Sequence, residues 1–435
     1  MDQNIAFNHL KVFADIGTRI AGTEPTKRAA DYIEKAFSHV GLETNRHHFD
    51  IPMYSLKKPS TLQVKINGKW QGLVHKAAWF AGDTPLDGVE APLVYAQDGS
   101  EAVLKRIEPE GKVLLIARDS YYNYPDDDIY RRLVKYKPAA VLFTTSAGWG
   151  GSEPPDVYYN FKTVDTEGEA PPTAVVLYSD ALELLEHNHD ILVQYNAQYN
   201  RSEGACANVI GTLAGTDSTG EAIVICAHFD SVPGGPGIGD DAGGIVTMMT
   251  LAEHYANLAR KGIRQKRTMH FIAWSGHEVG LHGSREFLRD NPDIFNNTKF
   301  VLNYDIVGNR ISTNTLMVSA SHQVTQEITE VCESLGYDWQ IDAGVWGLDT
   351  TNFCSKEIPG VNLVQTLTNW NHTTRDNIKS CHPDSFIDPI IFGKGLLDWV
   401  ANAESIQQGY PEDMNEVARS YSEKYGWGLY QEINV

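Results

Sequence analysis

Five residues in the C-terminal half of the chain have the side chains and the spacing to hold metal ions: His228, Asp240, Glu278, Asp305 and His372. Each follows an apolar run or lies in a glycine-rich turn. Two imidazoles and three carboxylates are ligands that can hold a pair of zinc-like ions around a bridging carboxylate. A single histidine or aspartate at a strand end is usually a cap or a satisfied polar group. The prediction of a metal site therefore rests on the ordered set.

The apolar runs before these residues predict the strands that must position them. Buried-strand runs occur at 222–227, 269–274, 300–304 and 361–366, and a helical pattern at 245–258 lies between the first two. Strands that alternate with helices predict a doubly wound, mainly parallel sheet with helices on both faces. Ligands of such α/β sheets bind beyond the carboxyl ends of the strands. We therefore expect the five side chains to converge on one edge of one sheet.

The residue pattern is different between the N-terminal segment and these strands. Short β-like runs at 113–116, 140–143 and 173–176 alternate with helical pieces and with loops rich in Pro, Asp and Tyr. We find no catalytic constellation in this stretch. The sequence therefore predicts a catalytic domain formed by residues 1–61 and 199–435, and a smaller β-rich α/β domain inserted at residues 62–198.

The local sequence around the five residues resembles the co-catalytic zinc aminopeptidase family, which includes bacterial leucyl aminopeptidases and the catalytic domains of glutamate carboxypeptidases. The inserted region resembles a protease-associated domain, with GKVLLIARD (111–119) and AAVLFTT (139–145) as its most typical strands. The opening stretch GTRIAGT (17–23) also resembles that of the family. The remaining motifs are His228-Phe229-Asp230, Gly239-Asp240-Asp241-Ala242-Gly243-Gly244, Glu278-Val279-Gly280-Leu281-His282-Gly283-Ser284, Asn303-Tyr304-Asp305 and His372-Thr373-Thr374-Arg375-Asp376.

The resemblance implies a ligand assignment for two metal ions. His228 and Asp305 would hold one ion. Glu278 and His372 would hold the other, and Asp240 would bridge the two. In this family the ions lower the pKa of a shared water and polarise the scissile carbonyl. We expect Zn²⁺, although Mn²⁺ and Co²⁺ also suit a site rich in carboxylates.

Three further positions carry the expected catalytic roles. Asp230 would orient His228 through its second ring nitrogen, as carboxylates behind metal ligands do. The family has two adjacent glutamates, a general base and then a ligand, but this chain has His277-Glu278. His277 therefore becomes the expected base, which a neutral imidazole can be. Asn371 stands where many members place a tyrosine, and its amide is the expected donor to an oxyanion.

The leading functional hypothesis is a metal-dependent hydrolase of an amide or peptide bond, most simply an aminopeptidase. Its substrate would be a small molecule or a short peptide or amide. The alternative is a lyase or cyclising enzyme that acts on a small metabolite, with the same two metals and with His277 as a proton shuttle. A binding module that has kept its metal is disfavoured, because all five ligands and Asp230 are present.

Composition narrows the partners and the compartment. The 435 residues are 42% hydrophobic and 21% charged, as in a globular protein. A formal charge of −20 argues against nucleic acid and anionic membranes as partners. No secretory signal or membrane-length apolar run is visible. Five cysteines without a close pair suggest a reducing cytoplasm. The C-terminal tail could pack on the body of the protein or on a second subunit, so the sequence is compatible with a homo-oligomer.

Overall fold

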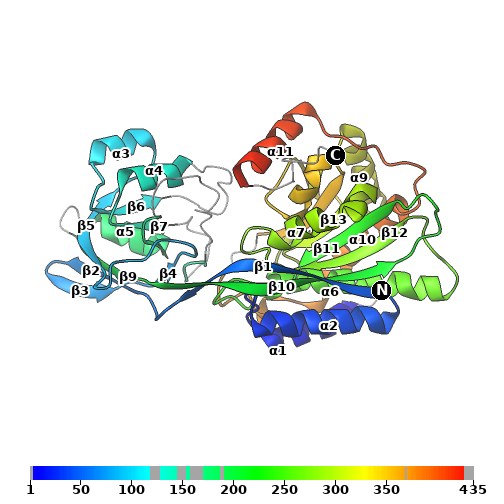
Figure 1. Ribbon diagram of the computed structural model, residues 1–435, viewed down its shortest axis with the longest axis horizontal. Helices are drawn as coiled ribbons and strands as arrows, with labels where there is room; N and C mark the ends of the chain where they lie inside the picture. The colour runs from blue at the N-terminus through cyan, green and yellow to red at the C-terminus, as the bar shows by residue number, and fades with distance from the viewer. Residues whose placement is uncertain are drawn as a thin grey trace. The chain divides into compact units, whose positions relative to one another are not determined.

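The computed structural model describes residues 3–117, 128–144, 153–156, 170–186, 191–367 and 370–425. Three residues of the segments resembling a protease-associated domain, Arg118, Asp119 and Thr145, lie outside them. The chain forms two compact units (Figure 1). Unit 1 consists of Met1–Ile51, Gly204–Thr368 and Thr374–Val435, and unit 2 consists of Pro52–Glu203 and Asn369–Thr373.

Unit 1 is built on an eight-stranded sheet in the order β1-β10-β12-β11-β13-β16-β14-β15. The four central strands β12, β11, β13 and β16 run parallel, whereas β10 and β14 pair antiparallel with their neighbours β12 and β16. This confirms the expected mixed, mainly parallel α/β fold. The strands are β1 (Glu43–Leu56), β10 (Tyr199–Leu213), β11 (Ala222–His228), β12 (Thr268–Trp274), β13 (Thr298–Asp305), β14 (Thr313–Ser319), β15 (Gln340–Ala343) and β16 (Gly360–Thr366).

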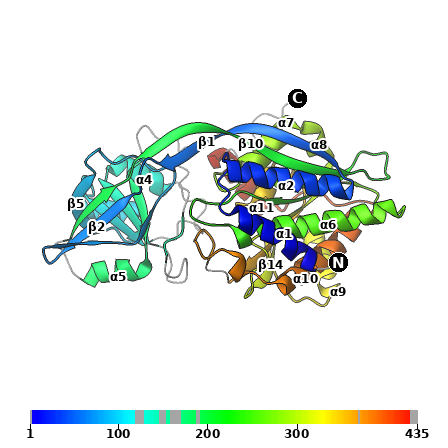
Figure 2. The ribbon, with the colours of Figure 1, turned by 90° about the horizontal axis from the view of Figure 1, so that it is seen from below.

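Apolar residues cover both faces of the central strands, so helices pack on each face. Alternate residues of a strand point to opposite faces. Ile223 and Ile225 of β11 join one core, and Val224 and Cys226 join the other. The first core is closed by α1 (Gln3–Ile16), α2 (Glu24–Val40), α6 (Gly243–Arg260), α9 (His322–Ser334) and α10 (Ile387–Val400), of which α1, α2 and α6 lie together in Figure 2. The second is closed by α7 (His282–Asp290), α8 (Pro292–Asn297) and the 3₁₀ segment η2 (Asp349–Lys356).

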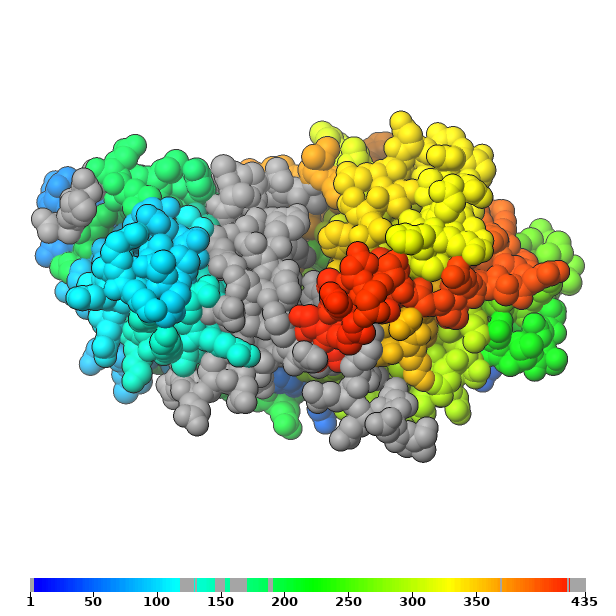
Figure 3. Space-filling model, turned by 90° about the horizontal axis from the view of Figure 1, so that it is seen from above, coloured from blue at the N-terminus to red at the C-terminus, as the bar shows by residue number. Residues whose placement is uncertain are grey.

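The last helix, α11 (Glu412–Tyr425), lies at the surface of unit 1, where Figure 3 shows it in red. Its Met414 and Ala418 are buried in a small cluster with Leu281 and Cys354. The helix therefore packs against η2 and against the loop that follows β12. Among the described residues no helix is long and apolar enough to cross a membrane.

Unit 2 has its own eight-stranded sheet, in the order β3-β2-β9-β5-β6-β7-β8-β4. Its strands β5, β6, β7 and β8 run parallel. Separate apolar cores lie on its two faces. The elements are β2 (Thr61–Ile66), β3 (Lys69–Gly72), β4 (His75–Ala77), β5 (Val89–Tyr95), α3 (Glu101–Ile107), β6 (Val113–Ala117), α4 (Asp128–Tyr136), β7 (Ala140–Thr144), β8 (Thr173–Val176), α5 (Tyr178–Glu186) and β9 (Leu192–Asn196).

Candidate metal centre

Two of the predicted ligands are the last residues of neighbouring parallel strands. His228 ends β11 and Asp305 ends β13, so both lie at the carboxyl edge of the sheet. Both side chains are buried. His228 Nε2 lies 3.9 Å from Asp305 Oδ1 and 3.2 Å from Asp240 Oδ1. The fold thus brings three predicted ligands together in unit 1.

Two groups of donor atoms form around His228. One combines His228 with Asp240 and Glu278, and the other combines it with His277 and Asp305. Within each group the ligand atoms lie within 4.8 Å of one another. The first group contains only predicted ligands. The second includes His277, which the sequence predicts to be a base rather than a ligand.

The turn that carries Asp240 is held by the carboxylate of Asp376. Asp376 Oδ1 accepts a hydrogen bond from the Gly239 amide at 2.6 Å, and Oδ2 accepts one from the Asp240 amide at 3.0 Å. The turn then enters α6 at Gly243, where a Cβ atom would lie 1.7 Å from the Val307 carbonyl oxygen. Only glycine fits there. These contacts explain why a glycine-rich segment surrounds the predicted bridging residue.

Arg19 holds together the two loop segments that lie between His228 and Asp240. Its buried guanidinium donates to the carbonyl oxygens of Phe229, Pro236 and Gly237 at 2.6–2.7 Å. Arg19 belongs to the N-terminal stretch that resembles the family's opening. Its structural role is therefore to fasten the segment after His228 to the segment before Asp240.

Asp230 supports the main chain of the next ligand loop. Its Oδ1 and Oδ2 accept hydrogen bonds from the amides of His277 and Glu278, each at 3.1 Å. The sequence predicts that its carboxylate orients His228, but His228 Nδ1 lies 3.9 Å from Asp230 Oδ1. The contact of Nδ1 is with the Asp230 carbonyl oxygen, at 3.2 Å. The Asp230 backbone thus holds His228, while its carboxylate holds the following loop.

His277 lies against His228, with the ring centroids 3.9 Å apart and the ring planes 6° from parallel. Its Nε2 is 3.8 Å from Asp305 Oδ2, and its Nδ1 is 2.8 Å from Asp349 Oδ2. Asp349 is buried at the start of η2 and also accepts a hydrogen bond from the Ser284 hydroxyl. No local motif in the sequence points to this contact of Asp349 with His277.

Burial and crowding of carboxylates dominate the electrostatics of this centre. Burial raises the pKa of Asp305 to about 7; His228 and His277 oppose this rise, and Asp240 adds to it. Burial lowers the pKa of His277, but the carboxylates of Asp349, Asp305 and Glu278 outweigh it, so that the net pKa lies well above the usual value. Such a cluster is short of positive charge.

Divalent metal ions fit these residues. Histidine nitrogen and carboxylate oxygen are the donors that zinc takes in catalytic sites. Asp305 Oδ2 is buried and makes no hydrogen bond to any residue the structure describes. A buried carboxylate oxygen without a donor is costly unless a cation satisfies it. The unpaired oxygen and the donor set therefore both suit a metal ion at Asp305.

The last two predicted site residues, Asn371 and His372, belong to the short segment Asn369–Thr373 of unit 2. There, His372 Nδ1 lies 2.8 Å from the Asp156 carbonyl oxygen, and the Asp156 amide donates to the His372 carbonyl oxygen at 2.8 Å. A carbonyl at Nδ1 leaves Nε2 as the atom suited to a metal. The placement of Asn371 and His372 beside the donor groups of unit 1 remains a prediction.

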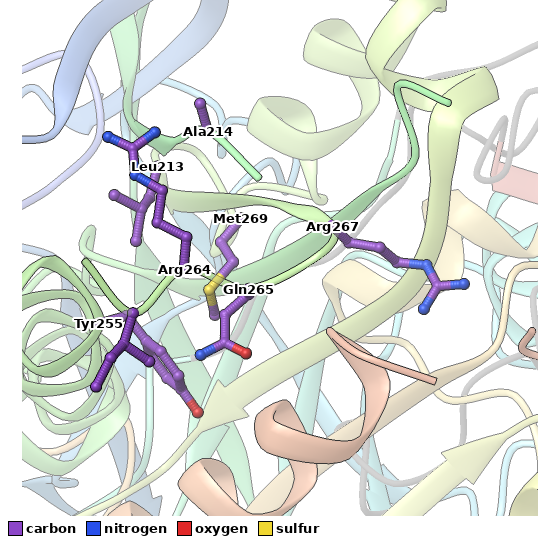
Figure 4. A pocket seen from close by; sticks show the side chains of 8 residues that line it. Leu213, Ala214, Tyr255, Arg264, Gln265, Arg267 and Met269 are labelled. Carbon is purple, nitrogen blue, oxygen red and sulfur yellow. The ribbon is translucent and has the colours of Figure 1, made fainter. Parts of the chain in front are cut away.

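A pocket elsewhere in unit 1 holds none of the predicted site residues (Figure 4). Met269 stands near the start of β12 and Leu213 at the end of the antiparallel β10, so the pocket lies at the amino edge of the parallel strands. In Figure 4 the Arg267 side chain points away from Tyr255 and Met269. Position and lining both separate this pocket from the metal centre.

Comparison with known proteins agrees with the geometry. Residues 208–388 match the model of peptidase family M28. Aminopeptidase YwaD of Bacillus subtilis is 24% identical over 388 residues, 84% of this chain and 77% of the relative. Carboxypeptidase Q of Xenopus laevis is 21% identical over 391 residues, 85% of this chain and 80% of the relative. A solved zinc aminopeptidase from Bacillus subtilis shares the fold, with a TM-score of 0.71, 19% identity, and coverage of 95% of this chain and 98% of that chain.

The matched segment begins in β10 and contains all the predicted metal ligands. The comparisons favour peptide-bond hydrolysis over the lyase or cyclising alternative. Residues 208–388 are therefore similar to peptidase family M28, and the chain is a metal-dependent hydrolase of peptide bonds that resembles the co-catalytic zinc aminopeptidases.

Proposed function

We propose that the chain is an aminopeptidase that holds two zinc ions and removes residues from short peptides. The observation that carries the proposal is the pair of donor groups that share His228 at the carboxyl edge of an M28 sheet. A two-metal site needs neighbouring donor groups and a carboxylate that can serve both ions, and Asp240 Oδ1 lies 3.2 Å from His228 Nε2. The named aminopeptidase relative supports the choice of the amino end of the substrate.

Each ligand has a position in this proposal. His228 and Asp305 would hold one ion, Glu278 and His372 would hold the other, and Asp240 would serve both. When bound, the two ions polarise the scissile carbonyl and acidify a water. Asp376 and Asp230 keep the ligand loops in place through backbone hydrogen bonds. Asn371 donates a hydrogen bond to the oxyanion as the carbonyl becomes tetrahedral.

The wider context of the enzyme also belongs to the proposal. Residues 62–198 would be a protease-associated domain, which the parallel strands β5 to β8 support. All five cysteines are buried and free of disulfides, which supports a cytoplasmic location. A homo-oligomer would show as a doubled or higher mass in light scattering. Cell fractionation tests the location.

The decisive experiment is hydrolysis by the zinc-loaded protein of aminoacyl amides, dipeptides and small acyl amides. We expect turnover of substrates with a free amino end and none of their N-acetylated forms. Matched peptides with an amidated carboxyl end separate this from carboxypeptidase action, the activity in the name of another relative. Asp240→Asn should abolish turnover, whereas Asp338→Asn, at an exposed acid of the same unit, should leave it unchanged. Absence of turnover on every free-amino substrate would refute the proposal.

A further inference from the structure

The residue at position 277 is one of two at which this chain departs from the family that it resembles, and its surroundings are those of a ligand. The two rings of His228 and His277 lie parallel, and each presents Nε2 to a different oxygen of the Asp305 carboxylate. The two nitrogen-to-oxygen distances are 3.9 Å for His228 and 3.8 Å for His277. His277 is thus placed with respect to Asp305 as His228 is, although the sequence assigns the two histidines different roles.

These distances suit closure around one ion. Ligand atoms on a four-coordinate zinc lie roughly 3.3 Å apart, since each is about 2.0–2.1 Å from the metal. The donor atoms of His228, His277 and Asp305 all lie within 4.8 Å of one another. Small side-chain rotations would bring them to ligand distances. Asp305 Oδ2, which His277 Nε2 faces, is the buried oxygen that lacks a hydrogen-bond partner among the described residues.

The other ring nitrogen of His277 has the support that metal-binding histidines have. A histidine ligand normally gives its second N–H to a carboxylate or carbonyl, which fixes the tautomer and the ring orientation. His277 Nδ1 lies 2.8 Å from Asp349 Oδ2. The second oxygen of Asp349 accepts from the Ser284 hydroxyl, and Ser284 Oγ accepts from Asn352 Nδ2 at 2.8 Å. A buried chain of hydrogen bonds therefore aims Nε2 of His277 at Asp305.

The same contacts disfavour the role of general base. A base needs an unshared nitrogen directed at the proton it removes. Nδ1 is engaged by Asp349, and Nε2 is directed at a carboxylate that is itself a predicted ligand. An Nε2 atom that binds a metal has no lone pair left for a proton.

We propose that His277 is a metal ligand, which completes a set of His228, His277 and Asp305 around one of the two ions. Asp349 is its positioning residue. The proposal rests on the metal binding in the proposed function and not on the peptide substrate. Two imidazoles and one carboxylate at this ion give a site richer in nitrogen than one imidazole and carboxylates, and nitrogen ligands favour zinc and cobalt over manganese.

The test measures metal binding directly, with purified protein that has been stripped of metal and reloaded with zinc. Competition with a chelating indicator gives the dissociation constants of both ions for the wild type and for His277→Ala, His277→Gln and His282→Ala. His282 is the first residue of α7, five positions after His277, and lies in neither donor group, so its variant is the matched control. We expect the affinity for one ion to fall by about 10- to 100-fold in both His277 variants and to stay unchanged in the control.

X-ray absorption spectroscopy of the zinc-loaded proteins gives a second readout that needs no activity. Scattering from imidazole rings should be weaker per zinc in His277→Gln than in the wild type at equal zinc loading. Unchanged affinities and unchanged imidazole scattering in a folded His277→Gln protein, with a fall in kcat alone, would restore the role of base and overturn the proposal. If the wild type binds zinc through His277 but hydrolyses no peptide, the ligand assignment stands and the proposed function fails.

Discussion

His228 and His277 are stacked neighbours, but the chain supports them differently. The ring of His228 is held through Nδ1 by a main-chain carbonyl, that of Asp230. The ring of His277 is held through Nδ1 by a buried carboxylate, that of Asp349, which lies 72 residues further along the chain. The first support is local, because it comes from the residue two positions later. The second exists only when η2 packs beside the loop after β12.

The difference shows how this centre departs from the motif that encodes it. The strand end with His228 carries its own support, so sequence alone indicates its role. The loop with His277 depends on Asp349 and Ser284, whose contacts no motif predicts. Where the support is a buried carboxylate, the ring gains negative charge behind it, which strengthens an imidazole as a metal ligand.

The largest effect should come from His228→Ala, because His228 Nε2 is an assigned ligand of the ion held with Asp305 and lies in both donor groups. We expect loss of that ion, with its affinity reduced at least about 1,000-fold, and loss of peptidase activity. Zinc titration of the stripped protein, followed by elemental analysis, measures this, and circular dichroism checks folding. Retention of two tightly bound zinc ions would contradict the assignment of His228 as a ligand.

The next largest effect should come from Asp230→Ala, which should lower the free energy of unfolding. The substitution leaves the buried amide of Glu278 and the partly buried amide of His277 without their acceptor. Two such unsatisfied donors cost about 2–4 kcal/mol of unfolding free energy. Urea unfolding of the metal-free protein measures the loss, and Asp338→Asn serves as the exposed control. A change below about 0.5 kcal/mol would mean that the loop does not depend on this carboxylate.

Asp349→Asn should weaken metal binding more than folding. The amide can still accept one hydrogen bond, but it removes the negative charge behind His277. Loss of such a supporting carboxylate lowers metal affinity about 10- to 100-fold. Chelator competition measures the affinity, and urea unfolding of the metal-free form should show a smaller loss than Asp230→Ala. Equal stability losses for the two variants would remove the distinction between the two supports.

The smallest effect on stability concerns His270. This residue lies in β12, the strand that leads to His277, but a hydroxyl rather than a carboxylate faces its ring nitrogen. Its Nδ1 faces the Thr212 hydroxyl at 3.0 Å, and burial lowers its pKa to about 4. Below about pH 6.5 the unfolded chain binds a proton there and the folded chain does not, so stability falls as pH drops from about 6.5 towards 4. The free energy of unfolding of His270→Gln should exceed that of the wild type by on the order of 1–2 kcal/mol at about pH 5. At about pH 8 the two free energies of unfolding should be equal. Urea unfolding at both pH values measures this, and equal differences at the two would contradict the assignment.

Much of unit 1 could be predicted from the sequence because its elements have strong local patterns. The four central strands are mostly apolar runs, and α2 ends before Gly41, whose φ of 90° suits glycine. Strand β14 and helix α1 escaped the prediction, because β14 alternates polar and apolar residues only weakly and α1 has no clear start signal. The ligands His228 and Asp305 follow from their places at strand ends.

The sequence by itself determined which side chains could bind metal and that strands would bring His228 and Asp305 to one edge of the sheet. Those facts depend on local periodicity and on short motifs, which folding does not alter. Only the tertiary structure decided what each side chain touches. Asp230 holds a backbone rather than a ring, and Asp349 directs His277 at Asp305, because residues far apart in sequence pack together. The spacing of residues along the sequence does not predict such contacts.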